Sequence, residues 1–321
     1  MSVSITVSFG ERLSGLYRKH LRPAMKRARR WYRREVELFE ARRKVAAGMS
    51  EQNALAALRS TTPRQRWEGA SVLGRHPQRS TEAIAVLIEA LADPEPFVCW
   101  RAAEALAAQD VTCVFHALTD ALTEGQPAQR AGAAAALGRV GGEAATTALC
   151  KQVEDPDPCV RQALAEALGQ IGDPTTAVEL VPMLDDADAD VRRAAAHALG
   201  QLGSPGTAVV LAEALARPDQ PLLVRRSLAA ALASAAQHPD AQPVLLAALA
   251  DPDPQVRGYA ARALAHIGNE VAYERLAELL SDRSRLLKGT VGDEARAARE
   301  MMERRGRRAA PPAPAPEEAA P

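Results

Sequence analysis

The chain repeats one short sequence along most of its length. Residues 155–173 read DPDPCVRQALAEALGQIGD, and close copies stand at residues 186–204 and 251–269. When the copies are aligned on a Val-Arg pair, seven units follow at steps of 31 to 33 residues, each with a Leu eight residues after the Val position. A period of this length is typical of a solenoid, in which each unit packs on the next. The aligned pairs are Gln65-Arg66, Val98-Cys99, Gln129-Arg130, Val160-Arg161, Val191-Arg192, Val224-Arg225 and Val256-Arg257.

Each unit carries the pattern of a helical hairpin. In its second half, apolar residues such as Leu164 and Leu168 recur at the spacing of one face of an α-helix. Asp157 is placed to cap this helix, Pro158 to occupy its first turn, and Gly172 to end it. The first half predicts another apolar helix, as at residues 81–91, 175–184 and 271–280. One hairpin cannot bury both of its apolar faces alone, so neighbouring hairpins must stack.

An acidic residue stands six positions before the Arg in most units. In stacked hairpins we expect these acids and arginines to form a ladder along the turns, joined by charge-assisted hydrogen bonds. Exposed pairs contribute only about 0–1 kcal/mol each, whereas burial of a Leu or Val contributes roughly 1.5–3 kcal/mol. We therefore expect the ladder to set register and the apolar core to supply stability. The predicted ladder residues are Asp93, Asp155, Arg161, Asp186, Arg192, Asp219, Arg225, Asp251 and Arg257.

The repeated pattern D-x-x-x-x-V-R-x-x-[AL]-x-x-A-L-G-x-[IL]-G resembles the short HEAT-like repeat that also occurs in phycobilisome bilin lyase subunits. The resemblance covers roughly residues 50–282. It implies an all-α fold, a right-handed α-solenoid of the HEAT-like or armadillo type, in which the second helix of each hairpin lines the concave face. It also implies, as an alternative function, a role in attaching a tetrapyrrole chromophore to a protein or removing it.

The two ends of the chain differ from the repeats. We expect a basic amphipathic helical arm or cap at residues 1–48, repeats at 49–282, a degenerate repeat with a cap helix at 283–308, and a disordered Pro/Ala-rich tail at 309–321. Residues 11–44 carry 13 Lys or Arg and 4 Asp or Glu. Three roles stay open for this arm: it packs on the first repeat, docks from Arg22 to Lys44 on a partner or an anionic membrane, or contacts nucleic acid.

Composition and motifs favour a binding protein in the cytoplasm, peripheral to a membrane if the arm binds lipid. No apolar run reaches the 18 residues of a membrane span, and the N-terminus lacks the features of a secretory signal. The four cysteines form no CxxC pair, so we expect reduced thiols. The chain has no phosphate-binding or nucleophile motif, and no His is followed by Glu, unlike the iron-binding pairs of the HEAT-like enzyme deoxyhypusine hydroxylase. We therefore expect no catalytic, metal or cofactor site.

The leading hypothesis is a non-catalytic protein–protein interaction scaffold that binds a protein or peptide in the concave groove. Trp67 and Trp100 occupy matching positions in adjacent repeats, and Trp and Arg are the residues most enriched at binding hot spots. The basic N-terminal helix is an alternative cover for both indoles. The alternative functions are a bilin lyase-like subunit or chromophore-protein chaperone, and a nucleic-acid-binding protein. The candidate binding residues on this face are Trp67, Trp100, Arg139, Arg193, Arg226 and Arg262.

Overall fold

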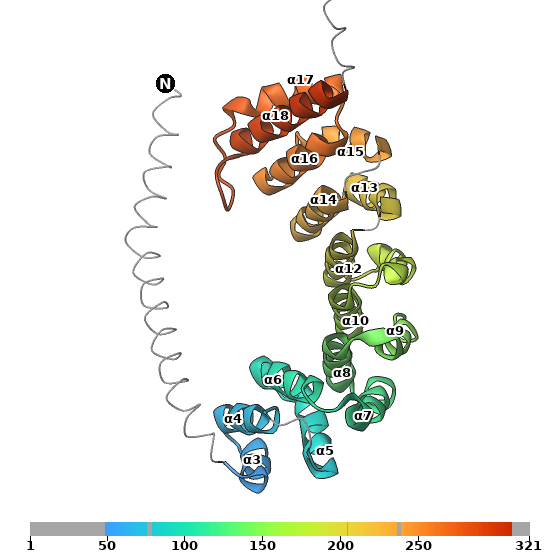
Figure 1. Cartoon of the computed structure of the whole chain (residues 1–321), viewed down its shortest axis with the longest axis vertical. Helices are drawn as coiled ribbons and strands as arrows, with labels where there is room; N and C mark the ends of the chain where they lie inside the picture. Colours follow the sequence, from blue (N-terminus) through green and yellow to red (C-terminus); the bar gives the residue numbers. More distant parts are fainter. Residues whose placement is uncertain (1–48, 76–78, 204, 236–238, 310–321) are drawn as a thin grey trace, which may run out of the picture. The chain divides into compact units, whose positions relative to one another are not determined.

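The computed structural model describes residues 49–75, 79–203, 205–235 and 239–309 (Figure 1). The predicted N-terminal arm and the Pro/Ala-rich tail beyond residue 309 lie outside the described residues, so what was expected of them stays a prediction. The chain divides into two compact units, residues 1–73 and 74–321.

The described part of the first unit is a single helical hairpin. Helix α3 (Glu51–Leu58) begins after Ser50, whose hydroxyl accepts the backbone N–H of Asn53 at 3.3 Å. Helix α4 (Pro63–Leu73) begins with a proline, as the pattern of the later repeats predicts. The two helices approach closely at Gly69, where an added Cβ would lie 2.5 Å from the backbone oxygen of Ala54.

The second unit is an all-α solenoid of stacked hairpins, which confirms the predicted fold class. We call the first helix of each hairpin its A helix and the second its B helix. The B helices form one row and the A helices lie along one side of it (Figure 1). The A helices are α5 (Thr81–Glu89), α7 (Val111–Glu124), α9 (Gly142–Cys150), α11 (Ala177–Leu180), α13 (Ala208–Ala216), α15 (Gln242–Ala248) and α17 (Glu270–Glu278). The B helices are α6 (Pro96–Ala107), α8 (Pro127–Val140), α10 (Pro158–Ile171), α12 (Ala189–Leu202), α14 (Leu222–Ala235), α16 (Pro254–Ile267) and α18 (Val291–Ala309).

The ends of the B helices follow from the repeated sequence. The Asp157 carboxylate accepts the backbone N–H of Cys159 at 2.8 Å, and Pro158 is the first residue of α10. Gly172 ends α10 with φ of 76°, a left-handed conformation that glycine adopts at little cost. The cap satisfies one of the free N–H groups that every helix exposes in its first turn.

The predicted A helix at residues 175–184 is wrong in one respect. The structure breaks this segment into a 3-10 turn (η4, Pro174–Thr176), the single α-turn of α11, and a second 3-10 turn (η5, Pro182–Asp185). Pro182 is the physical cause, because it has no N–H to continue the α-helical hydrogen bonds. Short 3-10 turns also accompany other A helices: η3 (Ala90–Ala92), η6 (Pro205–Thr207), η7 (Pro239–Ala241) and η8 (Leu279–Ser281).

The core consists of the apolar positions that recur in every repeat. All seven Leu side chains that stand eight residues after the Val position are fully buried. Burial of each such Leu contributes roughly 1.5–3 kcal/mol, so this column is a major source of stability. The seven are Leu73, Leu106, Leu137, Leu168, Leu199, Leu232 and Leu264.

Glycine lets successive B helices lie very close together. A Cβ added to Gly138 of α8 would lie 2.7 Å from the Cβ of Ala167 on α10, and one added to Gly169 would lie 2.7 Å from the Cβ of Ala198. Gly200 faces Ala231 in the same way, with the corresponding distance at 2.9 Å. The glycine of the repeated A-L-G sequence is therefore a packing residue in the middle of the B-helix contact.

Replacement of Gly138 by Ala tests this contact. Alanine is the better helix former by about 1 kcal/mol, but overpacking costs about 1–3 kcal/mol, so we expect Gly138→Ala to lower the free energy of unfolding. Urea unfolding followed by circular dichroism measures the change. Gly206→Ala is the matched control, because an added Cβ there meets nothing within 4 Å. A Gly138→Ala protein as stable as the unaltered chain would contradict the close-contact interpretation.

Candidate protein-binding surface

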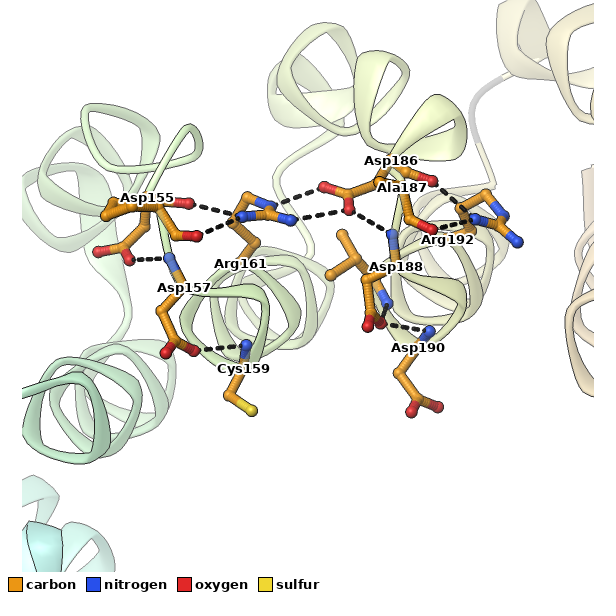
Figure 2. A network of polar contacts seen from close by, with 11 residues as sticks. Asp155, Asp157, Cys159, Arg161, Asp186, Ala187, Asp188, Asp190 and Arg192 are labelled. Atoms are coloured by element: carbon orange, nitrogen blue, oxygen red, sulfur yellow. Dashed lines mark hydrogen bonds and ion pairs between the residues drawn. The ribbon is translucent and has the colours of Figure 1, made fainter.

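In five B helices, α8, α10, α12, α14 and α16, an arginine near the start of the helix joins two consecutive turns. In α10, Nε and Nη2 of Arg161 donate to the Asp186 carboxylate at 2.7 and 2.9 Å. Nη1 of the same arginine donates to the backbone oxygens of Asp155 and Pro156 at 2.8 and 3.1 Å. Figure 2 shows this chain of contacts running from Asp155 through Arg161 and Asp186 to Arg192. Arg161 therefore binds the backbone of its own repeat and the acidic side chain of the next.

The same arrangement recurs along the second unit. Arg130 donates two hydrogen bonds of 2.7 Å to Asp155, and Arg225 donates to Asp251 at 3.0 and 3.4 Å. Arg257 ends the series with hydrogen bonds of 3.0 and 2.8 Å to the Asp282 carboxylate. Asp282 was not among the predicted ladder residues, because those acids were found by counting six residues back from each Arg. A different count finds it, because the acid follows the arginine by 25 residues at Asp155, Asp186 and Asp282 alike.

The prediction that Asp219 belongs to the ladder is wrong. Asp219 is exposed, and the buried Gln220 accepts the Nε–H of Arg192 at 3.2 Å in its place. The reason is that the turn before α14 is one residue shorter, so the side chain that faces Arg192 comes one position later. Gln220 also accepts Nη1 of Arg225 on its backbone oxygen at 3.0 Å, which is the double role that Asp155 and Asp186 play.

At the N-terminal end of the second unit the ladder contains a thiol. Cys99 stands at the position of the ladder arginine, and its Sγ–H donates to the backbone oxygen of Asp93 at 2.9 Å. Burial, together with the negative charge of Asp93, raises the pKa of this thiol. Cys99 is therefore a neutral hydrogen-bond donor to the turn, and it keeps the backbone half of the ladder contact.

The ladder is more buried than an exposed surface pair. The Asp155 side chain is 3% exposed and its partner Arg130 is 14% exposed. The Asp186 side chain is 10% exposed. For pairs this sheltered, loss of one partner leaves an uncompensated charge, which costs about 3–5 kcal/mol in buried sites. The ladder residues consequently have a structural role, and they are not available to bind a partner.

Three ladder carboxylates, Asp155, Asp186 and Asp282, are held in their charged form by a lowered pKa. Burial raises the pKa of Asp155, but the hydrogen bonds from Arg130 and the backbone N–H of Asp157 outweigh it, so the net shift is downward. The hydrogen bond from Arg161 is the largest influence on Asp186 and lowers its pKa. At Asp282 the hydrogen bonds from Ser284 and Arg257 overcome the effect of burial and again lower the pKa.

Three arginines predicted to bind a partner are engaged with neighbouring side chains. Arg226 donates to Asp253 at 2.6 and 3.0 Å, which joins α14 to the start of α16. Arg262 pairs with Glu294 of α18 at 2.6 Å, and Arg193 pairs with Asp190 within α12 at 3.2 Å. The pairs of Arg226 and Arg262 connect successive B helices. They satisfy these cations inside the chain, so partner binding by the two arginines stays a prediction that the contacts do not favour.

An aromatic patch remains exposed on the B-helix row. Trp100 is 51% exposed and Phe97 is 46% exposed, three residues apart on α6. The guanidinium carbon of Arg139, on the neighbouring helix α8, lies 5.9 Å from the centroid of the Trp100 ring. We call Phe97, Trp100 and Arg139 the aromatic patch. Sequence reasoning named Trp100 and Arg139 but missed Phe97, although its spacing from Trp100 places both on one helix face.

Trp67 lies on α4 in the first unit and is half-buried. Trp100 lies in the second unit, and the pairing of Trp67 with Trp100 stays a prediction. Among the described residues, no three His, Cys, Asp or Glu side chains gather into a group that could hold a metal ion. No helix within the described ranges has the length and apolar character needed to cross a membrane.

Comparison with known protein families identifies the repeats. A family model described as HEAT repeats matches residues 146–233 and 219–292. A second, described as the PBS lyase HEAT-like repeat, matches residues 129–155. These matches confirm the resemblance to HEAT-like repeats. No curated protein matches the chain significantly.

Three solved structures are similar to this chain to different degrees. The YibA protein of Escherichia coli matches with a TM-score of 0.58 at 20% identity, over 81% of this chain and 95% of that one. An engineered protein matches with a TM-score of 0.46 at 23% identity, over 80% and 82% of the two chains. The CpcE–CpcF complex of phycocyanin lyase from a Nostoc species matches with a TM-score of 0.36 at 23% identity, over 79% and 95%. The match to YibA, at 20% identity, shows a common fold and leaves function to be argued from the site.

Removal of one ladder charge should cost far more stability than removal of an exposed one. We expect Asp155→Asn to lower the free energy of unfolding by about 3 kcal/mol, because it leaves Arg130 buried without its counter-charge. Asp190→Asn is the matched control, since its pair with Arg193 is 67% and 32% exposed, and should cost under about 1 kcal/mol. Chemical unfolding of both variants measures the difference. Equal losses would show that the ladder behaves as an ordinary surface pair.

The lowered pKa values of Asp155, Asp186 and Asp282 predict a specific loss of stability in acid. A carboxyl whose folded pKa is below its unfolded value of about 3.9 stabilises the fold fully above that value, and its contribution disappears as pH falls through the folded value. We expect the free energy of unfolding to fall steeply below about pH 4, with a shallower slope in an Asp155→Asn, Asp186→Asn double variant. Urea unfolding at several pH values checks this, and identical slopes would refute it.

Proposed function

We propose that this chain, whose repeats are HEAT repeats, is a non-catalytic scaffold that binds a protein partner on its B-helix row. Support comes from the architecture, because a row of stacked helices presents an extended surface of the kind that repeat proteins use for binding. The aromatic patch is the part of this surface best suited to anchor a partner.

The exposure of Phe97 and Trp100 is the observation that carries the proposal. Aromatic residues make up only 3% of the chain, yet two large ones stand half-exposed at neighbouring positions of one helix. Isolated exposed apolar residues are common on soluble proteins. Adjacent aromatic side chains are a different case, because each can bury a large apolar area at an interface and such residues dominate binding energy.

Arg139 supports the same face in two ways. Its Nη1 donates to the backbone oxygen of Ala135 at 3.0 Å, and its guanidinium lies beside the Trp100 ring. A cation–π contact at an exposed site contributes about 0.5–1 kcal/mol, which helps to hold the indole in one orientation before binding. A pre-ordered anchor loses less conformational freedom when a partner arrives. We therefore expect an apolar side chain of the partner to pack against Trp100.

The alternative functions have narrower support. A bilin lyase-like role rests on the match of residues 129–155 to a repeat described as that of a lyase, and within this segment Arg130 and Asp155 are accounted for by the ladder. A nucleic-acid-binding role would need free cations on the B-helix row, where Arg226 and Arg262 pair with acids. Co-expression with a bilin and an acceptor protein would test the first alternative, with a covalent adduct as the positive result.

Replacement of the aromatic patch should abolish partner binding without unfolding the chain. We expect a Phe97→Ala, Trp100→Ala double variant to lose at least about tenfold in affinity for a captured and purified partner, because loss of a hot-spot pair costs about 2 kcal/mol or more. Binding would be measured with the purified partner by calorimetry.

Val111→Ala with Val271→Ala is the matched control. Both valines are exposed, at 49% and 52%, and lie on the A-helix side, outside the aromatic patch. Equal binding by the double aromatic variant and this control, with both folded by circular dichroism, would contradict the proposal.

A further inference from the structure

Two adjoining hollows flank α9 on the A-helix side of the second unit. One, of about 910 Å³, lies between α9 and the segment from Ile171 to Glu179. The other, of about 480 Å³, lies between α7 and α9. Glu143, Thr147 and Lys151 line both hollows, so they adjoin across α9. We call the two together the α9 groove. It has no residue in common with the aromatic patch.

The groove follows from the packing of the B helices. Gly138 and Gly169 hold α8, α10 and α12 in close contact, while the A helices attached to them have no such contact residues. Pro182 also shortens α11 to a single turn. The A helices thus stand apart where the B helices touch, and the space between them is open to solvent.

The walls of the groove combine apolar and hydroxyl side chains. Phe115 of α7 and Ala148 of α9 line the smaller hollow. Ile171 and Val178 line the larger one, and Val178 is 69% exposed. Such a lining suits the aliphatic stem of a long side chain whose charged end stays hydrated.

The charge around the groove is negative. Glu143, Asp173 and Glu179 are its acidic lining residues, and Lys151 is the one basic side chain among the residues that line the two hollows. Glu143 and Glu179 make no ion pair within the described part of the chain, unlike the ladder acids. Hydrogen bonds from the backbone N–H and hydroxyl of Thr175 lower the pKa of Asp173 and keep it charged.

The pKa of Cys150, which lines the larger hollow, responds to the negative charge of the groove. The pKa of its thiol is raised by burial first, and then by the negative charges of Glu179 and Asp173. The acids on the wall therefore act on the interior of the groove as well as on its rim. A cation placed there would gain from the same field.

We propose that the α9 groove binds a Lys- or Arg-bearing segment of a partner protein. The apolar walls would bury the stem of the basic side chain, and Glu143 and Glu179 would bind its charged head. The negative charge disfavours nucleic acid, whose phosphates would meet the same carboxylates. The proposal goes beyond the aromatic patch, and either site can fail its test alone.

The test uses the full-length protein and a fluorescein-labelled twelve-residue peptide of alternating Lys and Leu. We expect saturable binding by fluorescence anisotropy, and at least a tenfold loss of affinity in a Glu143→Gln, Glu179→Gln double variant. The matched control is Glu270→Gln with Glu274→Gln, exposed acids of α17 whose replacement changes the net charge equally. The control should change affinity less than twofold.

Three results would overturn the proposal. Equal loss in both double variants would show general electrostatic attraction without a site. Absence of saturable binding would remove the groove as a docking surface. Equally strong binding of spermidine, which carries charge without a peptide, would assign the site to small polyamines. A Phe97→Ala, Trp100→Ala protein should bind the peptide normally, which separates this test from that of the scaffold function.

Discussion

The close contact between successive B helices is the constraint on which the rest of the second unit depends. Glycines at 138, 169 and 200 remove the side chains that would hold the helices apart, and alanines fill the opposite side of each contact. The contact buries the Leu column, which supplies the apolar stabilisation that a single hairpin lacks. It also brings the start of each B helix within hydrogen-bonding reach of the next turn, and so it makes the arginine ladder possible.

The arginine ladder fixes the register between neighbouring repeats. A guanidinium presents its donors in a rigid planar fork, so two parallel bonds to one carboxylate are satisfied in only one relative position of the two repeats. The acid also accepts a backbone N–H of its own turn, as Asp186 does from Asp188 at 2.8 Å. This second hydrogen bond holds the carboxylate in the orientation that the arginine needs. At Gln220 a neutral amide oxygen accepts the hydrogen bond from Arg192 in place of a carboxylate. The position of the acceptor is therefore kept in this repeat, although its negative charge is not.

The sequence of one repeat predicts the features that lie within that repeat. The features that it does not predict are contacts between repeats. The capping of α10 by Asp157 and the burial of the Leu column follow from spacing within one unit. Asp282 and Gln220 were missed because the partner of each arginine lies in the next repeat, at a distance along the chain that varies with turn length. The pairing of Arg226 with Asp253, which joins a candidate binding residue to the next repeat, was missed for the same reason. Burial of the ladder could not be predicted either, because it depends on how tightly the turns pack.

The same packing explains where binding surfaces are left. On the B-helix row, Arg226 and Arg262 meet acids of the neighbouring repeat, and Phe97 and Trp100 are aromatic side chains that stay exposed there. On the A-helix side around α9, no arginine of the described residues pairs with Glu143 or Glu179, and the separation of the helices leaves the α9 groove. Contacts between B helices thus pair Arg226 and Arg262 with acids of the next repeat, whereas Glu143 and Glu179 make no ion pair among the described residues. The two proposed sites therefore differ in character, one aromatic and one acidic.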